Sequence, residues 1–287
     1  MQETERLEKY WDRILSQLHD QKEEEWLYKK VSSIESRGDR IQRVSVRLKP
    51  YHRSAYEDKT ELAYMLHLAL LLKNGRQSYL EEGLYHGKAT FLRGEWTGHA
   101  ICTEDRIASG ETSLSQFVEK GNEETSRFAY NRREAVRYAE RWWNSYNPAY
   151  RHFDVDCTNY ISQCLKAGGA PMWGMPNRGK GWWYSGNSWS YSWAVAHALR
   201  WYLSGARKGL TATEVSSADQ LSPGDVICYD FQGNDRFDHN TMVVKKNSDG
   251  MPLVNAHTSN SRHRYWAYED STAYTPNIQY KFFRIGG

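Results

Sequence analysis

The sequence has few cysteines, and their spacing argues against two common uses of that residue. Four of the 287 residues are cysteines, at positions 102, 157, 164 and 228. No two of them are spaced as CxxC, so the pattern predicts neither a zinc site of that type nor a disulfide framework. A large excess of one charge is missing too, because the net charge of +3 is too small to indicate a nucleic-acid partner.

Long apolar segments are also missing. No run reaches the length of about 20 residues that a membrane-spanning helix needs, and the N-terminal residues lack the apolar core of a signal peptide. We therefore expect a protein without a membrane span, cytoplasmic as the chain is written, with action on the cell wall still open. The sequence predicts no cofactor and leaves the oligomeric state open.

The most informative stretch runs from Asp156 to Leu165 and is followed by Gly168-Gly169. Its apolar residues recur at i, i+3, i+4, i+7 and i+8 from Cys157, which predicts one short helix with one buried face. Asp156 can cap the start of this helix, and the glycine pair suits its end. Cys157 then lies in the first turn, where unpaired N–H groups and the helix dipole favour a thiolate and lower the pKa of a thiol. The same N–H groups can hold an oxyanion.

Two later segments supply the partners that a reactive Cys157 needs. His239 stands at the start of an apolar, β-rich run, and Asn255 lies in the next short strand. These residues can form a nucleophile, base and orienter set if the fold brings them together. His257 is the alternative orienter, because residues two apart on a strand share a face. We favour Asn255, whose amide oxygen can accept a hydrogen bond from an imidazole without adding a charge.

Two other interpretations concern the same residues. Cys157 can be a buried structural cysteine, which is the role we assign to Cys164, two turns further along the buried face. His239, His257 and His263 could ligate a metal together with Cys157. A helix N-terminus already accounts for a thiolate at Cys157 without any metal, so we predict no metal site.

Several motifs follow one another in a recognisable order: Asp156–Leu165, Ala167–Met172, Trp182–Tyr184, Ser192-Trp193, Gly224–Ile227, Asp238-His239 and Val254–Thr258. In this order they resemble the bacterial "putative amidase domain" family, from about Tyr130 to the C-terminus. That family is similar to the NlpC-type and CHAP cell-wall hydrolases, which share a papain-like core. The resemblance implies a cysteine amidase or peptidase that acts on peptidoglycan peptides without a metal.

We therefore predict a cysteine hydrolase that cleaves an amide or peptide bond in peptidoglycan through an acyl-enzyme. In the predicted triad, Cys157 attacks, His239 moves the proton and Asn255 orients His239. The alternative is a non-catalytic module on the same fold that binds cell wall or peptide. Which amide bond is cut stays open. The predicted substrate-binding residues are Asp156, Trp182 and Trp183.

The first domain is predicted to span residues 1–103 and to carry one helix on a curved antiparallel sheet. The 3.6-residue period over residues 7–18 predicts the helix. Alternating apolar residues predict strands over 40–48 and 61–72, and Asn74-Gly75 predicts a hairpin into a partner strand over 77–96. Gly83 or Gly87 could bulge that strand.

Residues 104–127 are rich in Glu, Ser, Thr and Gly, which predicts a linker. The second domain, 128–287, is predicted to begin with helices and to end with strands, which is an α+β order and the order of papain-like hydrolases. The expected helices cover residues 131–146, 157–167 and 192–203. The expected strands are 226–229, the His239 strand, the Asn255 strand and 278–285, and 173–189 is expected to be a long loop.

Overall fold

The structure is a computed structural model that describes residues 2–19, 23–102 and 128–286. The predicted linker, 104–127, lies outside these residues. The chain forms two compact units, Met1–Asp105 with Tyr268–Thr272 and Arg106–Ala267 with Ala273–Gly287. Both combine helices with antiparallel strands, which confirms the α+β class. Within the described ranges, no helix is long and apolar enough to cross a membrane.

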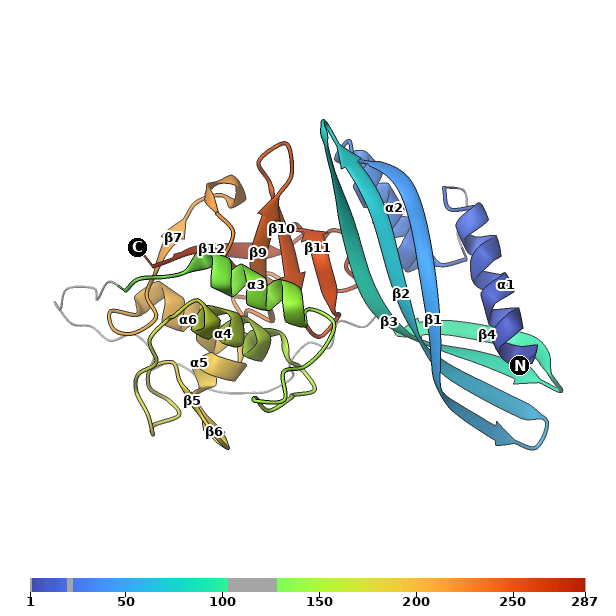
Figure 1. Ribbon diagram of the computed structural model, residues 1–287, viewed down its shortest axis with the longest axis horizontal. Coiled ribbons are helices and arrows are strands. Elements are labelled where there is room, and N and C mark those ends of the chain that lie inside the picture. Colours follow the sequence, from blue (N-terminus) through green and yellow to red (C-terminus); the bar gives the residue numbers. More distant parts are fainter. Residues whose placement is uncertain (1, 20–22, 103–127, 287) are drawn as a thin grey trace. The chain divides into compact units, whose positions relative to one another are not determined.

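In the first unit, two helices cover one face of an antiparallel sheet whose described strands follow one another in chain order (Figure 1). The helices present Leu7, Trp11 and Ile14, and then Leu27 and Val31, to the core. The elements are α1 (Gln2–Ser16), α2 (Glu25–Ser36), β1 (Arg40–Tyr56), β2 (Lys59–Asn74), β3 (Gln77–Leu92) and β4 (Glu95–Cys102).

The first helix, the strands and the hairpin agree with the sequence patterns. On β2 the even-numbered residues from Leu62 to Leu72 are buried, as period-two alternation requires. The hairpin pairs Asn74 with Gln77, and Gly75 has φ 56°. That left-handed conformation suits glycine, which carries no Cβ.

Three expectations for this unit are wrong. The second helix, α2, was not expected. The predicted strand 77–96 is two strands, because Arg93 and Gly94 turn the chain with φ of 50° and 79°. Gly83 and Gly87 cause no bulge, since β2 and β3 pair without a register shift. A Cβ at Gly87 would lie 2.4 Å from the Tyr64 ring, so this glycine makes room for that ring.

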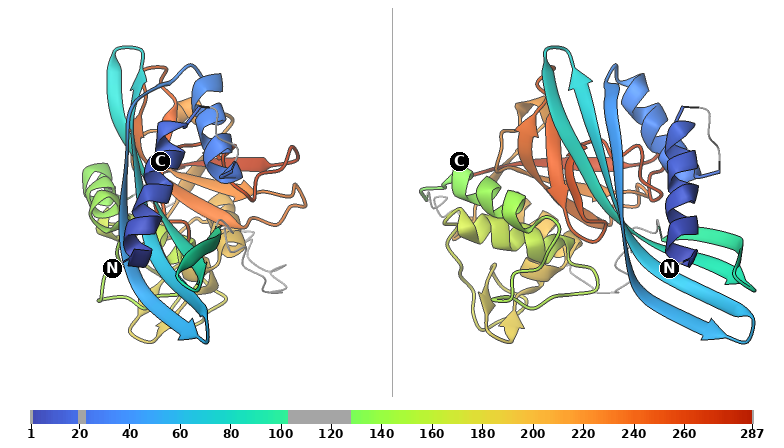
Figure 2. Two further views of the ribbon diagram at one scale, coloured as in Figure 1. Left: turned by 90° about the vertical axis from the view of Figure 1, so that its right-hand side faces the viewer. Right: turned by 45° about the vertical axis from the view of Figure 1, so that its right-hand side comes forward.

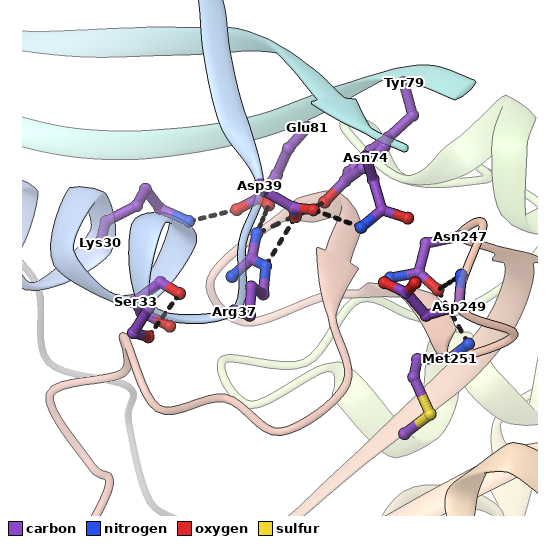
Figure 3. Close-up of polar contacts among 11 residues, drawn as sticks. Lys30, Ser33, Arg37, Asp39, Asn74, Tyr79, Glu81, Asn247, Asp249 and Met251 are labelled. Carbon is purple, nitrogen blue, oxygen red and sulfur yellow. Dashed lines mark hydrogen bonds and ion pairs between the residues drawn. The ribbon is translucent and has the colours of Figure 1, made fainter. Parts of the chain in front are cut away.

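A buried polar cluster, which we call the Asp39 cluster, joins α2 to β2 and β3 (Figure 3). Asp39 accepts hydrogen bonds of 2.7 Å from Arg37 Nε, Asn74 Nδ2 and Tyr79 Oη. Glu81 pairs with Lys30 and lies 3.5 Å from Arg37 Nη2. In this cluster, the buried carboxylates are therefore paired with cations and hydrogen-bond donors. The Asp39 cluster consists of Lys30, Arg37, Asp39, Asn74, Tyr79 and Glu81.

The second unit packs its helices against a twisted antiparallel sheet in the order β11-β10-β9-β8-β12-β7 (Figures 1 and 2). Its helices are α3 (Arg132–Trp142), α4 (Cys157–Ala167), α5 (Tyr191–Ala194), α6 (Ala196–Gly205) and the 3-10 turn η1 (Ala218–Gln220). Its strands are β7 (Ala212–Val215), β8 (Val226–Asp230), β9 (His239–Lys246), β10 (Pro252–Ala256), β11 (Ser261–Tyr265) and β12 (Gln279–Ile285). A two-stranded ribbon, β5 (Tyr184–Ser185) with β6 (Ser188–Trp189), stands apart from this sheet.

The order of elements in this unit follows the sequence prediction, and its boundaries differ in places. The helix expected over 192–203 is broken at Val195, whose φ and ψ of −116° and 124° are extended. Strands β7 and β11 and the short ribbon were not expected. The core lies between α4 and β9, where every residue of α4 from Cys157 to Leu165 is buried.

Candidate active site

Cys157 is the first residue of α4, as its sequence pattern predicts. The helix ends where Gly168 N–H donates to the Cys164 carbonyl, and Gly169 then takes a left-handed φ of 87°. Asp156 does not cap the helix with its side chain. One of its oxygens instead accepts hydrogen bonds from Phe153 N and Asn159 Nδ2. The carboxylate therefore holds the loop before Cys157.

The Cys157 sulfur is buried and lies in a hydrogen-bonding environment. It is 3.7 Å from Thr158 Oγ1. Burial raises the pKa of Cys157, and the Asp156 carboxylate adds to that effect, while hydrogen bonding from Thr158 and Asn240 opposes it. The pKa of this thiol is therefore raised, whereas the helix N-terminus alone predicts a lowered pKa.

Strand β9 packs against α4. Its first two residues, His239 and Asn240, point to opposite faces of the sheet. His239 is the register partner of Tyr229, and the two rings lie 5.7 Å apart. Asn240 points to the helix side, where its Nδ2 donates to Thr158 Oγ1 at 3.0 Å. Neighbouring strand residues point to opposite faces, so the His239 side chain leaves the strand on the side away from Thr158. Its role as the base of Cys157 stays a prediction.

Asn255 is fully buried on the helix side of β10. Its Nδ2 donates to Glu140 Oε1 at 3.0 Å, and its Oδ1 accepts from His263 N at 2.9 Å. Burial acts against ionisation of Glu140, but the neighbouring His263 and Arg262 lower its pKa to about 2. Asn255 thus belongs to a charged network that joins α3 to β11. That it orients His239 stays a prediction.

His257, the alternative orienter, is buried beside the start of α4. Its Nδ1 lies 2.9 Å from Asp156 Oδ2 and its Nε2 lies 2.7 Å from the Trp142 carbonyl. Its ring stacks on Tyr160 with centroids 4.0 Å apart. Both ring nitrogens face acceptors, and both can donate only when the ring is doubly protonated. His257 therefore ties the loop before Cys157 to α3.

The two tryptophans predicted to bind substrate are core residues in this structure. Trp182 and Trp183 are 0% and 1% exposed. Trp182 Nε1 donates to Ser162 Oγ at 3.0 Å, and Trp183 Nε1 lies 3.1 Å from the carbonyls of Asn177 and Lys180. Because large aromatic rings bury much apolar area, their contribution here is to packing. Neither ring presents a surface to a ligand.

Two buried atoms at the start of β9 lack partners. Asp238 Oδ2 and Asn240 Oδ1 are covered by the protein and receive no hydrogen bond. Burial, together with the nearby Asp230 carboxylate, raises the pKa of Asp238 to about 6. Unpaired buried polar atoms are costly, and they are expected where a ligand completes the site.

Asn240 and Thr158 are the residues of this site that the sequence did not predict. Both stand directly beside predicted residues, since Asn240 follows His239 and Thr158 follows Cys157. Their polar side chains, directly after the two predicted catalytic residues, were the signal that could have identified them. In the described part of the chain, no three His, Cys, Asp or Glu side chains gather as metal ligands.

Helix α4, which begins with Cys157, packs against the antiparallel strand β9. Residues 129–283 match the family described as "Putative amidase domain". This match covers more than half of the chain, and the protein belongs to that family. The description of this family suggests amide hydrolysis.

Two bacterial relatives were found. The chain is 50% identical over 236 residues to the "Uncharacterized protein YhbB" of Bacillus subtilis (strain 168), covering 79% of this chain and 74% of that protein. It is 30% identical over 169 residues to the "Uncharacterized protein YjcM" of the same organism, covering 56% of this chain and 38% of that protein. No solved structure matches.

Proposed function

We propose that the second unit is a cysteine hydrolase that cleaves an amide bond through an acyl-enzyme. One observation carries this proposal: Cys157 is the first residue of α4, and its sulfur lies 3.7 Å from the Thr158 hydroxyl, which accepts a hydrogen bond from Asn240 on β9. The unpaired N–H groups of a helix N-terminus stabilise a thiolate, and they can stabilise the oxyanion that forms when a carbonyl is attacked.

In the proposed reaction, the thiol proton passes to an imidazole as the Cys157 sulfur attacks the amide carbonyl. The oxyanion collapses, the C–N bond breaks, and the leaving amine takes the proton from the imidazolium. Water then hydrolyses the thioester and restores the thiol.

His239 is the proposed base, and Asn255 its proposed orienter. The contact of Asn240 with α4 supports His239, because it brings the first residues of β9 close to Cys157. The side on which His239 leaves the strand weighs against it. His257 stays the alternative orienter, since it lies on the helix side and bonds to Asp156, the residue before Cys157.

The proposed substrates are peptidoglycan peptides. The description of the family supports amide hydrolysis, and the order of helices before strands is similar to the NlpC-type and CHAP hydrolases with their papain-like core. Purified muropeptides incubated with the wild-type protein and with Cys157→Ala test the proposal. Mass analysis should find cleaved products only with the wild type. Equal products from both proteins would overturn it.

A non-catalytic binding module is the second candidate. The raised pKa of Cys157 favours it, because a neutral buried thiol is a weak nucleophile. The two candidates differ in what happens to bound muropeptides. A binding module retains them intact, whereas the hydrolase releases fragments.

A further inference from the structure

Asn240 decides which way the Thr158 hydroxyl faces. The Asn240 Nδ2 group can only donate, so its contact of 3.0 Å with Thr158 Oγ1 makes that oxygen an acceptor. The Thr158 O–H must then donate elsewhere. Its other hydrogen-bonding contact among the described residues is the Cys157 sulfur, 3.7 Å from Oγ1. The hydroxyl proton is therefore directed at the sulfur of the proposed nucleophile.

The opposite orientation of the Asn240 amide would reverse both hydrogen bonds. Oδ1 would accept from the Thr158 O–H, and the Cys157 thiol would become the donor to Thr158 Oγ1. The unpartnered buried group, which is Oδ1 in this structure, would then be an NH₂ group with two N–H donors. In protein backbones, buried N–H groups without an acceptor are rarer than carbonyl oxygens without a donor. The same preference favours Nδ2 at Thr158.

The packing of α4 against β9 fixes the positions of these three side chains. Cys157 and Thr158 are the first two residues of α4, and Asn240 is the second residue of β9. Cys157 and Thr158 are 1% exposed, and Asn240 is fully buried. Because the three residues are buried, little solvent competes for the Thr158 hydroxyl, and the direction of its hydrogen bond is set by the protein.

A hydroxyl that donates to the sulfur stabilises the thiolate more than the thiol. Hydrogen bonds to an ionised acceptor are roughly twice as strong as those between neutral groups, so such a donor lowers the pKa of a thiol. Burial raises the pKa of Cys157, and the hydrogen bond from the Thr158 side chain is the largest of the effects that lower it. The hydroxyl thus opposes burial at the atom that attacks in the proposed reaction.

We propose that Asn240 is a positioning residue that holds the Thr158 hydroxyl as a hydrogen-bond donor to the Cys157 sulfur. The proposal rests on the proposed function, because it concerns the ionisation of the nucleophile of that reaction. When the sulfur loses its proton, it accepts the Thr158 O–H, and no covalent bond forms or breaks at Thr158 or Asn240. The Asn240 side chain acts on the sulfur through Thr158.

The test measures the pH dependence of Cys157 alkylation by iodoacetamide in the full chain, with peptide mapping to separate the cysteines. Thr158→Val keeps the shape of the side chain and removes the hydroxyl. It should raise the apparent pKa of Cys157 by about one unit, which slows labelling about tenfold at any pH below both values. Thr158→Ser keeps the hydroxyl and should restore labelling to within about twofold of the wild type.

A second variant tests the same hydrogen bonds from the strand side. Asn240→Leu removes the donor to Thr158 and should slow the labelling of Cys157 by about three- to tenfold. Because Asn240 acts through Thr158, the double variant Thr158→Val with Asn240→Leu should label no more slowly than Thr158→Val alone. Asn240→Leu also decides the matter if Thr158→Val does not fold.

Ser162 supplies a matched control on the same helix. It is a fully buried hydroxyl that donates to the Trp193 carbonyl at 2.8 Å and accepts from Trp182 Nε1 at 3.0 Å. Ser162→Ala also removes a buried hydroxyl with two hydrogen bonds, but it should leave the pH dependence at Cys157 unchanged. Labelling of the buried Cys164 in every variant reports any general opening of the fold.

Three results would contradict the proposal. The apparent pKa of Cys157 could be unchanged or lowered in Thr158→Val, which would make the sulfur the donor. Asn240→Leu could label like the wild type, or the two single effects could add in the double variant. Labelling needs no turnover, so the two proposals fail separately. A raised pKa in Thr158→Val of a protein that cleaves no muropeptide would overturn the proposed reaction and leave this hydrogen-bonded arrangement standing.

Discussion

Both units bury polar side chains, but they differ in whether those side chains are paired. In the Asp39 cluster of the first unit, a buried carboxylate accepts three hydrogen bonds of 2.7 Å. In the second unit, Asp238 and Asn240 at the start of β9 and Arg200 on α6 each keep a buried atom without a partner. Similar buried polar side chains therefore have all their hydrogen-bond partners in the Asp39 cluster, which we call saturated, and lack some of them in the second unit, which we call unsaturated.

This difference separates stability from function. When every group of a buried cluster already has a partner, a bound ligand adds little to the free energy of unfolding. Removing one member leaves the others buried and unpaired. An unsaturated group lowers stability until a ligand satisfies it, a cost that functional sites commonly carry. We therefore expect the Asp39 cluster to stabilise the first unit and the start of β9 to bind a ligand.

The largest expected effect concerns the proposed base. His239→Ala should lower muropeptide turnover by about 10²–10⁴-fold, the usual contribution of a general base, with little change in stability. His257→Ala should lower stability instead, because Asp156 loses its hydrogen-bonded partner. Initial rates from liquid chromatography, together with urea unfolding, measure both effects. A turnover loss that is severe only in His257→Ala would contradict the role of His239 as the base.

The next effect is on the saturated cluster. Asp39→Ala should lower the free energy of unfolding by about 3–5 kcal/mol, the usual cost of breaking a buried charged pair. It leaves Arg37, Asn74 and Tyr79 without their shared acceptor. Urea unfolding of the full chain measures this.

An exposed ion pair in the same unit supplies the control for Asp39→Ala. Asp58 pairs with Arg93 at 2.9 Å, and both side chains are more than half exposed. Asp58→Ala should change the free energy of unfolding by about 0–1 kcal/mol, because solvent screens surface ion pairs. Similar losses in the two variants would show that saturation of the Asp39 cluster contributes nothing special.

A smaller effect is expected at Asp238. Its pKa is raised to about 6 by burial and by Asp230, so the folded state favours the protonated carboxyl. That stabilising contribution is complete below about pH 4 and is lost as the pH rises through 6. Relative to Asp238→Asn, the wild type should therefore lose about 1–2 kcal/mol of unfolding free energy between pH 4 and pH 7.5. Parallel pH profiles of the two proteins would contradict this.

The smallest expected effect is a difference among thiols. Burial raises the pKa of Cys157, Cys164 and Cys228, so iodoacetamide should label all three slowly at pH 7 and faster as the pH rises. Hydrogen bonds from Thr158 and Asn240 oppose the shift at Cys157, which should react several times faster than the other two. Peptide mapping of the labelled sites measures the rates. Equal, slow labelling would favour the non-catalytic module.

The sequence predicted the elements whose signal is local. The alternation of β2, the hairpin glycine at position 75 and the 3.6-residue period of α4 each lie within one short segment. Helix α2 was missed although Trp26, Leu27, Val31 and Ile34 form its buried face. The helical spacing of these residues was the available signal, and it is a weaker periodicity than that of α4.

The contacts of the site could not be predicted in the same way. The hydrogen bond between Asn240 and Thr158 joins residues 82 positions apart, and that between His257 and Asp156 joins residues 101 apart. Such pairs depend on how α4 packs against β9 and β10, and periodicity within one segment carries no information about it. The missing partner of Arg200 is likewise a property of the packed core.

The most direct measurement of the central claim is the mass of the protein during turnover. Muropeptides mixed with the wild type and quenched in acid within seconds should yield a thioester adduct. Its mass should equal that of the protein plus the muropeptide, less the leaving amine, and proteolysis should locate it in the peptide that contains Cys157. Muropeptide cleavage that continues at the wild-type rate in Cys157→Ala, with no adduct in either protein, would contradict the account.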